Sequence, residues 1–225
     1  MIRVVVVDDS AFMRKALTTM LEKDPDIKVV ATARNGADGL EVIRQHDPDV
    51  VTLDIEMPKM DGLTALRHIM MEMPRPVLMV SSLTTDGAES TLKAMELGAV
   101  DFIPKQLSKV SLEIVKIEKD LQQKVKYISR RKIRAPRAVR SSVTPKATPR
   151  PVAPAMTGRP KRDVVAIGVS TGGPPAVQKV LSKLPANFPA AILIAQHMPQ
   201  AFTGPFAKRL DSVCKIKVKE AEGTE

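Results

Sequence analysis

The chain has 225 residues, 44% of them hydrophobic, which is enough for one large domain or two small ones with a real core. A single cysteine, Cys214, excludes an internal disulfide framework, and the chain has neither a signal-peptide pattern nor an apolar run near the roughly 20 residues that span a bilayer, so we expect a cytoplasmic protein that is not embedded in a membrane. The formal net charge is +10, but residues 129–162 alone hold eleven Arg and Lys residues and no acid, so the basicity is local.

Predicted strands and helices alternate through the first 125 residues. Apolar runs predict strands at residues 2–7, 28–33, 49–54, 76–82 and 99–104. Amphipathic patterns predict helices at residues 11–24, 36–46, 61–72, 87–98 and 108–128. Five strands that alternate with five helices indicate a doubly wound parallel α/β sheet, whose ligand site lies at the carboxyl ends of the strands.

Polar residues stand at these strand ends. Asp8 and Asp9 end the first strand, Asp54 ends the third, Ser81 ends the fourth and Lys105 follows the fifth. Crowded carboxylates repel one another unless cations compensate, and Mg²⁺ fits because it prefers a few carboxylates plus a phosphate oxygen. Asp54 would then accept a phosphoryl group, with which Lys105 pairs and to which Ser81 donates a hydrogen bond. The alternative is that these residues are helix caps and turn acids. It explains any single one of them well, but it explains all five at matching strand ends poorly.

The motifs DD at 8–9, DIEMPKMDG at 54–62, MVSS at 79–82 and the lysine at 105 resemble the receiver domain of two-component response regulators. The resemblance covers residues 1–125 and implies a flavodoxin-like (βα)5 fold. It implies that Asp54 is the phosphoacceptor, that Ser81 and Lys105 are switch residues with Phe102 at the aromatic switch position, and that Mg²⁺ is held by Asp8, Asp9, Asp54 and the Glu56 carbonyl. Receivers usually have proline after the lysine, whereas this chain has Gln106, so we expect a trans peptide bond there.

The basic segment divides the chain. Residues 129–162 contain six prolines, few large apolar residues and no aromatic residue, a composition that cannot offset the entropy of ordering by burial. We predict a flexible linker over residues 126–162, with a solvated spacer as the preferred interpretation and a basic arm for an acidic partner or nucleic acid as the alternative. Because aromatic residues for base stacking are absent from it, we do not expect a nucleic-acid partner.

Beyond the linker, residues 163–225 predict part of a doubly wound, Rossmann-like α/β domain. Strands are expected at 163–170, 190–199 and 214–219, and helices at 174–185 and 200–211. Ser170 lies in Gly-Val-Ser-Thr-Gly, the spacing of a nucleophile elbow, although a serine at such a turn is more often a cap or a phosphate contact. His197 ends the next strand, where a base for Ser170 would have to lie, and this favours a nucleophile and base pair.

The stretches IGVSTGGPPAV and IAQHMPQAFTGPFAKRLD resemble the catalytic domain of the chemotaxis receptor methylesterases, in which a linker joins a receiver to an esterase. The resemblance implies that Ser170 is the nucleophile and His197 the general base, with Thr171 near the oxyanion and Met198 in the active-site wall. It also implies hydrolysis of methyl esters on receptor glutamates and deamidation of receptor glutamines. The implied partners are a chemotaxis histidine kinase and methyl-accepting chemoreceptors, and we expect a monomer.

Residues 163–225 match only the N-terminal part of such a domain. The family supplies a catalytic aspartate further along, and Asp211 occupies a position with no catalytic role in the motif. We therefore expect a truncated product that is at best a feeble esterase alone. Two functions stay open: a methylesterase and deamidase controlled by phosphorylation, and a phosphoreceiver whose output is binding alone.

Limited trypsin digestion tests the predicted linker. Because residues 129–162 combine many Arg and Lys residues with no sign of burial, we expect the first cuts there and a stable fragment that ends near residue 128. Mass spectrometry of the fragments over time measures both. Persistent protection across residues 130–162 would show instead that the segment packs on a domain.

Overall fold

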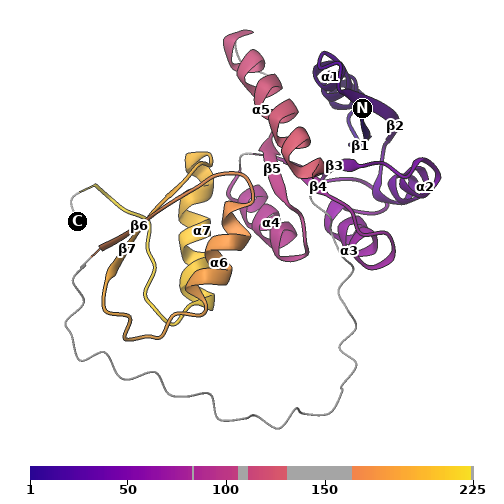
Figure 1. The fold of residues 1–225 in the computed structure, drawn as a ribbon. Coiled ribbons are helices and arrows are strands. Elements are labelled where there is room, and N and C mark those ends of the chain that lie inside the picture. Colours follow the sequence, from indigo (N-terminus) through magenta and orange to yellow (C-terminus); the bar gives the residue numbers. More distant parts are fainter. Residues whose placement is uncertain (83, 106–110, 131–163, 224–225) are drawn as a thin grey trace, which may run out of the picture.

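The structure is a computed structural model that describes residues 1–82, 84–105, 111–130 and 164–223. These residues form an N-terminal unit, up to residue 130, and a C-terminal unit, from residue 164 (Figure 1). Most of the predicted linker lies outside the described residues. No helix among the described residues is both long and apolar enough to cross a membrane.

The N-terminal unit is a five-stranded parallel sheet with strand order β2-β1-β3-β4-β5. The strands are β1 (Ile2–Val7), β2 (Ile27–Ala33), β3 (Val50–Asp54), β4 (Val77–Ser81) and β5 (Asp101–Pro104). The helices are α1 (Ala11–Glu22), α2 (Gly36–His46), α3 (Gly62–Glu72), α4 (Thr85–Glu96) and α5 (Ser111–Ser129). The predicted flavodoxin-like class is therefore confirmed, and every predicted element of this unit is present.

Both faces of this sheet are buried. In β1, Val5 and Val7 pack on the face covered by α2, α3 and α4, whereas Val4 and Val6 pack on the face covered by α1 and α5. This alternation follows from the two-residue period of a strand, and burial on both faces explains why the strand is apolar throughout. The core reaches Ile128, which is fully buried, so α5 continues four residues into the predicted linker and ends at Ser129.

The C-terminal unit has a two-stranded parallel sheet, β6 (Val164–Val169) and β7 (Ala191–Gln196), with α6 (Gly173–Leu181) and α7 (Gln200–Val213). Among the described residues no strand forms at 214–219, and that prediction was wrong. Ile216 and Val218 pack on the cluster between α6 and α7, and the Val218 N–H donates to Asp211 Oδ1 at 2.9 Å. Ile216 and Val218 alternate with exposed lysines as in a strand, but they are half-buried against this cluster without pairing to the sheet.

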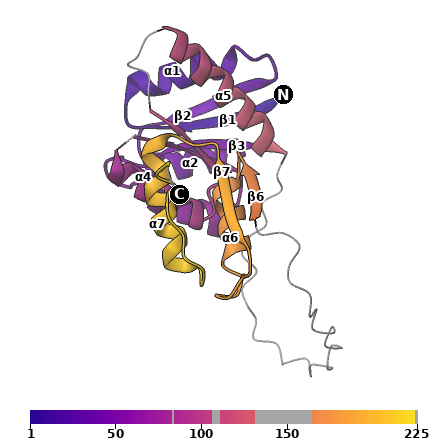
Figure 2. The same cartoon turned by 90° about the vertical axis from the view of Figure 1, so that its left-hand side faces the viewer.

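The two units contact each other through α4, α6 and α7, which lie between the two sheets (Figures 1 and 2). Leu92 of α4 packs in a cluster with Val177, Leu181, Phe206 and Leu210 of the C-terminal unit. Burial of this apolar surface makes the contact a hydrophobic one.

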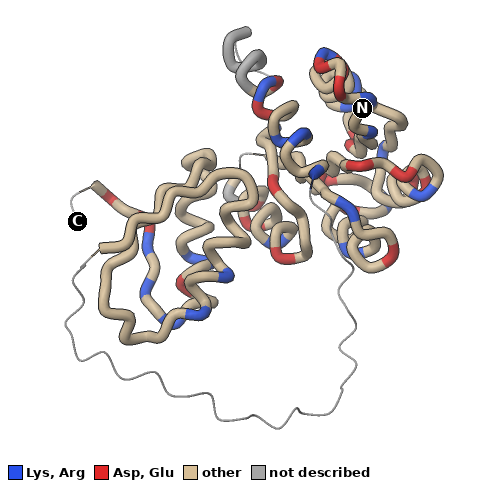
Figure 3. Tube along the Cα trace, in the orientation of Figure 1, with Lys and Arg blue, Asp and Glu red and all other residues tan. Residues whose placement is uncertain are grey.

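Charged and aromatic side chains border the apolar contact. Arg209 of α7 forms an ion pair with Glu96 of α4. The rings of Phe102 and Phe202 stack with centroids 4.6 Å apart and an interplanar angle of 15°. Elsewhere in the N-terminal unit positive and negative residues are interspersed (Figure 3). The contact between the units therefore combines an apolar cluster with an ion pair and a pair of stacked rings.

Gly62 tests how closely α3 approaches the end of β3. A Cβ atom there would overlap the carbonyl oxygen of Asp54, and backbone atoms cannot move aside cheaply. We expect Gly62→Ala to lower the free energy of unfolding by roughly 1–3 kcal/mol, measured by urea unfolding followed by circular dichroism. Gly168→Ala is the control, because a Cβ there meets no atom within 4 Å. Equal stability of the two variants would contradict this account.

Candidate functional site

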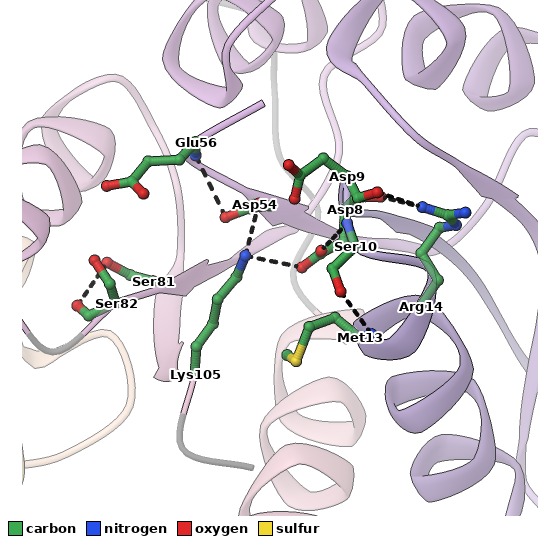
Figure 4. Close-up of polar contacts among 10 residues, drawn as sticks. All are labelled: Asp8, Asp9, Ser10, Met13, Arg14, Asp54, Glu56, Ser81, Ser82 and Lys105. Atoms are coloured by element: carbon green, nitrogen blue, oxygen red, sulfur yellow. Dashed lines mark hydrogen bonds and ion pairs between the residues drawn. The ribbon is translucent and has the colours of Figure 1, made fainter. Parts of the chain in front are cut away.

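Three carboxylates meet at the carboxyl end of the N-terminal sheet (Figure 4). Asp8 and Asp9 follow β1 and Asp54 ends β3; since Val7 pairs with Leu53, the residues that follow lie side by side. One oxygen of each aspartate lies within 4.8 Å of the others. Asp8 and Asp54 are buried, whereas Asp9 is exposed.

One oxygen of each buried aspartate supports its own turn. Asp8 Oδ1 accepts a hydrogen bond from the Ser10 N–H at 2.9 Å, and Asp54 Oδ1 accepts one from the Glu56 N–H at 3.3 Å. The Oδ2 oxygen of each is buried and is ion-paired with Lys105. The interpretation as turn acids therefore accounts for one oxygen of each carboxylate, whereas the other oxygen faces a cation.

Lys105 supplies a positive charge beside the two buried aspartates. Its Nζ lies 2.7 Å from Asp54 Oδ2 and 3.2 Å from Asp8 Oδ2. Burial raises the pKa of Asp54 to about 6, and the hydrogen bond and charge of Lys105 offset this only in part. Burial likewise raises the pKa of Asp8 above its ordinary value. For Lys105, burial alone would lower the pKa, but the contacts with both aspartates outweigh it and raise the pKa.

The residues present fit Mg²⁺. Three carboxylates, two of them buried and sharing one lysine, form an all-oxygen donor set of the kind that a hard cation prefers. The Glu56 carboxylate points away from the three aspartates in Figure 4, so Glu56 would contribute through its backbone carbonyl, as the sequence resemblance implied.

Arg14 and Ser10 hold the loop that carries Asp8 and Asp9, and the sequence analysis missed both. Arg14 Nη1 donates to the carbonyl oxygens of Asp8 and Asp9 at 2.8 and 2.9 Å. The Ser10 side chain accepts a hydrogen bond from the Met13 N–H and so caps α1. The rule that serine favours helix N-caps could have identified Ser10, whereas no sequence pattern indicated the role of Arg14.

Of the predicted switch residues, Lys105 pairs with Asp54, whereas Ser81 and Phe102 contact other groups. Ser81 is buried at the end of β4, and its hydroxyl bonds toward α4 rather than toward Asp54. Phe102 of β5 is 4% exposed and stacks on Phe202 of the other unit. The peptide bond before Gln106 lies outside the described residues, so the expectation about it stays a prediction.

The C-terminal unit brings Ser170 and His197 together. Val169 pairs with Gln196, so the next residue of each strand lies at the same edge of the sheet. Ser170 Oγ is 3.5 Å from His197 Nδ1, a long distance for a hydrogen bond that is common for a catalytic pair without substrate. The turn after Ser170 is tight because Gly172 adopts a left-handed φ of 72°.

Gln196 ties the two strand ends together, and the sequence analysis missed it. Its Nε2 donates to the carbonyl oxygens of Ser170 at 3.3 Å and of His197 at 3.2 Å. Gly173 allows this close approach, because a Cβ there would overlap Gln196 Oε1. The side chain therefore fixes the backbone that carries both candidate catalytic residues.

A cleft of about 640 Å³ opens beside Ser170 and lies between the two units. Thr171 and His197 line it from one side, and Lys124 and Tyr127 of α5 line it from the other. Met198 packs instead against the hydrophobic clusters of both units. The structure thus places Thr171 beside the candidate nucleophile and Met198 at the junction between the units.

Family models match both units. The model described as response regulator receiver domain matches residues 4–115, and the model described as CheB methylesterase matches residues 165–225. Among solved structures, the response regulator domain of Thermotoga maritima CheB is 45% identical with a TM-score of 0.52, covering 57% of this chain and 96% of that one. Fold and acidic edge together define a response-regulator receiver, followed by part of a methylesterase unit.

Curated relatives extend the match over the whole chain. The protein-glutamate methylesterase/protein-glutamine glutaminase 1 of Oleidesulfovibrio alaskensis is 73% identical, over 100% of this chain and 66% of the relative. A counterpart numbered 3 in Pseudomonas syringae pv. syringae is 46% identical, over 98% of this chain and 67% of its own length. The chain belongs to the CheB family of protein-glutamate methylesterases/protein-glutamine glutaminases, as the sequence resemblance predicted, and spans about two thirds of the length of these relatives.

The raised pKa of Asp54 makes stability depend on pH. Because the folded state binds the Asp54 proton more tightly than the unfolded chain does, this group stabilises the fold fully below about pH 3.8 and loses that contribution as the pH rises through about 6. A difference of this size corresponds to about 3 kcal/mol. We expect Asp54→Asn to raise the free energy of unfolding of the metal-free protein by up to this amount at pH 8 and by much less at pH 4.

Urea unfolding in EDTA at both pH values measures this difference. Glu89→Gln, which changes an exposed carboxylate of α4, is the matched control. An Asp54→Asn effect that is the same at pH 4 and pH 8 would show that Asp54 is ionised in the fold at both.

Proposed function

We propose that the protein is a chemotaxis methylesterase and deamidase that is controlled by phosphorylation of Asp54. The observation that carries the proposal is the pairing of Ser170 Oγ with His197 Nδ1 at 3.5 Å, in a cleft that also faces the receiver helix α5. The activities for which the relatives are named support the same chemistry for this chain. Its substrates would be methylated glutamates and particular glutamines of chemoreceptors, and its phosphodonor a chemotaxis histidine kinase.

In the receiver, the ionised Asp54 carboxylate attacks the phosphorus of the donor, the bond to the donor's leaving group breaks, and an acyl phosphate forms. Asp8, Asp9, Asp54 and the Glu56 carbonyl would hold Mg²⁺, which when bound neutralises charge on the phosphoryl oxygens. Lys105 already lies 2.7 Å from Asp54 and would pair with one of those oxygens.

In the esterase unit, Ser170 Oγ attacks the ester carbonyl while His197 Nδ1 takes the hydroxyl proton. The tetrahedral intermediate collapses with loss of methanol, which receives that proton, and water then releases glutamate from the acyl-serine. With a glutamine substrate the same steps release ammonia. Gln196 keeps the two backbone segments in place.

Contacts between the units support control of the esterase by the receiver. α5 lines the cleft beside Ser170, and α4 packs on α6 and α7. A receiver in this position restricts access of a receptor segment to Ser170. Phosphorylation of Asp54 would loosen the contact through Phe102 and α4, and so open the cleft.

The second candidate is a phosphoreceiver whose output is binding alone. One observation favours it: among the described residues, His197 has no carboxylate hydrogen-bonded to it, whereas such a carboxylate is worth about 10⁴ in kcat in serine proteases. Asp211 does not supply this group, because it accepts the Val218 N–H and pairs with Lys217.

Methanol release from methylated receptor membranes distinguishes the two candidates. The assay uses the 225-residue chain and a version extended to the length of the curated relatives, each with and without Mg²⁺ and acetyl phosphate. We expect slow release from the shorter chain, faster release from the longer one, and stimulation by acetyl phosphate.

Three variants make the assay specific. Ser170→Ala should lower release by roughly 10⁴-fold or more, whereas Ser182→Ala, an exposed serine of the same unit, should leave it unchanged. Asp54→Asn should abolish the acid-labile phosphoryl group and the stimulation. Full release by Ser170→Ala would overturn the proposed nucleophile, and equal labelling of Asp54→Asn would overturn the proposed phosphoacceptor.

A further inference from the structure

A pair of buried hydroxyl groups joins the end of β4 to α4. Thr91 is 0% exposed and Ser81 is 1% exposed, and their hydroxyl oxygens lie 2.7 Å apart. The Gly87 carbonyl oxygen lies 2.6 Å from Thr91 Oγ1 and 3.2 Å from Ser81 Oγ. The Ser82 carbonyl is a further acceptor for Ser81, at 3.3 Å (Figure 4). The two hydroxyls and the Gly87 carbonyl therefore form one closed network between β4 and α4, and the Ser82 carbonyl borders it.

Each hydroxyl has a single proton, which limits the possible arrangements. Thr91 donates either to Ser81 or to the Gly87 carbonyl, and Ser81 donates to the Gly87 or the Ser82 carbonyl. In each arrangement the proton of Ser81 is used by one of these carbonyls. Ser81 must therefore leave the network before its hydroxyl can donate to a group on Asp54.

The backbone of α4 is shaped for this contact. A Cβ at Gly87 would lie 2.6 Å from the Ser82 carbonyl oxygen, so the first turn of α4 comes this close to β4 only because residue 87 is glycine. When Ser81 leaves, Thr91 can still donate to Gly87, four residues back along the helix. Thr91 thus exchanges one neutral hydrogen bond for another, while Ser81 exchanges a neutral hydrogen bond for one to the charged phosphoryl group.

We propose that Thr91 is a positioning residue that holds the Ser81 hydroxyl in a resting position, in competition with the phosphoryl group on Asp54. This proposal rests on the proposed phosphorylation of Asp54. One neutral hydrogen bond corresponds to about a fivefold change in an equilibrium constant. Thr91 therefore sets how readily Ser81 turns to the acyl phosphate, and loss of its hydroxyl favours the phosphoryl-bound position.

The helix that contains Thr91, α4, also contacts the C-terminal unit. Leu92, the residue after Thr91, packs against Val177 and Phe206, and Glu96 pairs with Arg209. A bond between Ser81 and Thr91 thus links the phosphorylation edge to the helix that contacts the C-terminal unit.

Beryllofluoride, which mimics a phosphoryl group on aspartate, is the probe for this test. Its affinity for the full chain in Mg²⁺ is measured by ¹⁹F NMR titration. Thr91→Val keeps the shape of the side chain but removes the hydroxyl, and we expect it to bind about fivefold more tightly than the unmodified chain. Thr91→Ser should bind as the unmodified chain does. Thr19→Val, which removes a similar bond to the carbonyl four residues back on α1, is the matched control.

A double variant separates positioning from a purely structural role. In a Ser81→Ala background, Thr91→Val should no longer change the affinity, because the competing hydroxyl is gone. If Thr91→Val unfolds the chain, as seen by circular dichroism, Thr91→Ala takes its place. Unchanged or weaker binding by the folded variant overturns the role of Thr91 while leaving Asp54 phosphorylation intact. Failure of the unmodified chain to bind beryllofluoride overturns the proposed phosphorylation and, with it, this inference.

Discussion

Two carboxyl groups, Asp8 and Asp54, are buried side by side at the ends of neighbouring parallel strands, with the Lys105 ammonium between them. Burying a charge is costly unless it is paired, and two like charges at one site raise that cost further. Burial is the main cause of the raised pKa of Asp54, and the neighbouring charge of Asp8 raises it further. A divalent cation is a ligand that this imbalance of two carboxylates and one ammonium favours, because it supplies the missing positive charge.

The neighbouring elements hold the two buried carboxylates in place despite the free-energy cost of burying them. The Asp8 and Asp9 loop is held by Arg14 through two backbone carbonyls, so the charges are fixed without neutralising either carboxylate. Gly62 lets α3 begin directly against the backbone of Asp54. Buried valines on both faces of β1 supply the hydrophobic stabilisation that offsets the cost of the edge. The polar site is thus maintained by an apolar sheet.

The helix α4 of the N-terminal unit makes contacts with side chains of both units. On one side Thr91 bonds to Ser81, and on the other Leu92 packs among apolar side chains of α6 and α7. A rigid helix with contacts on both sides transmits a small movement, because packed interiors have few intermediate arrangements. The stacked Phe102 and Phe202 rings provide a second contact between the same two units. Contiguous groups therefore connect the edge that carries Asp54 to the unit that carries Ser170.

Local patterns in the sequence determined the elements of the N-terminal unit and the set of residues at its strand ends, because strand and helix periods and cap preferences act over a few residues. They also indicated Ser170 and His197, since both follow strands that pair in parallel register. The segment 214–219 shows where such patterns end: its alternation is strand-like, but the Val218 N–H bonds to Asp211. Only the tertiary structure decided that this segment does not join the sheet. It also decided the roles of Arg14, Gln196 and Thr91 and the contact of α4 with the C-terminal unit. Each of these depends on which distant backbone, hydroxyl or apolar group lies within hydrogen-bonding or packing distance.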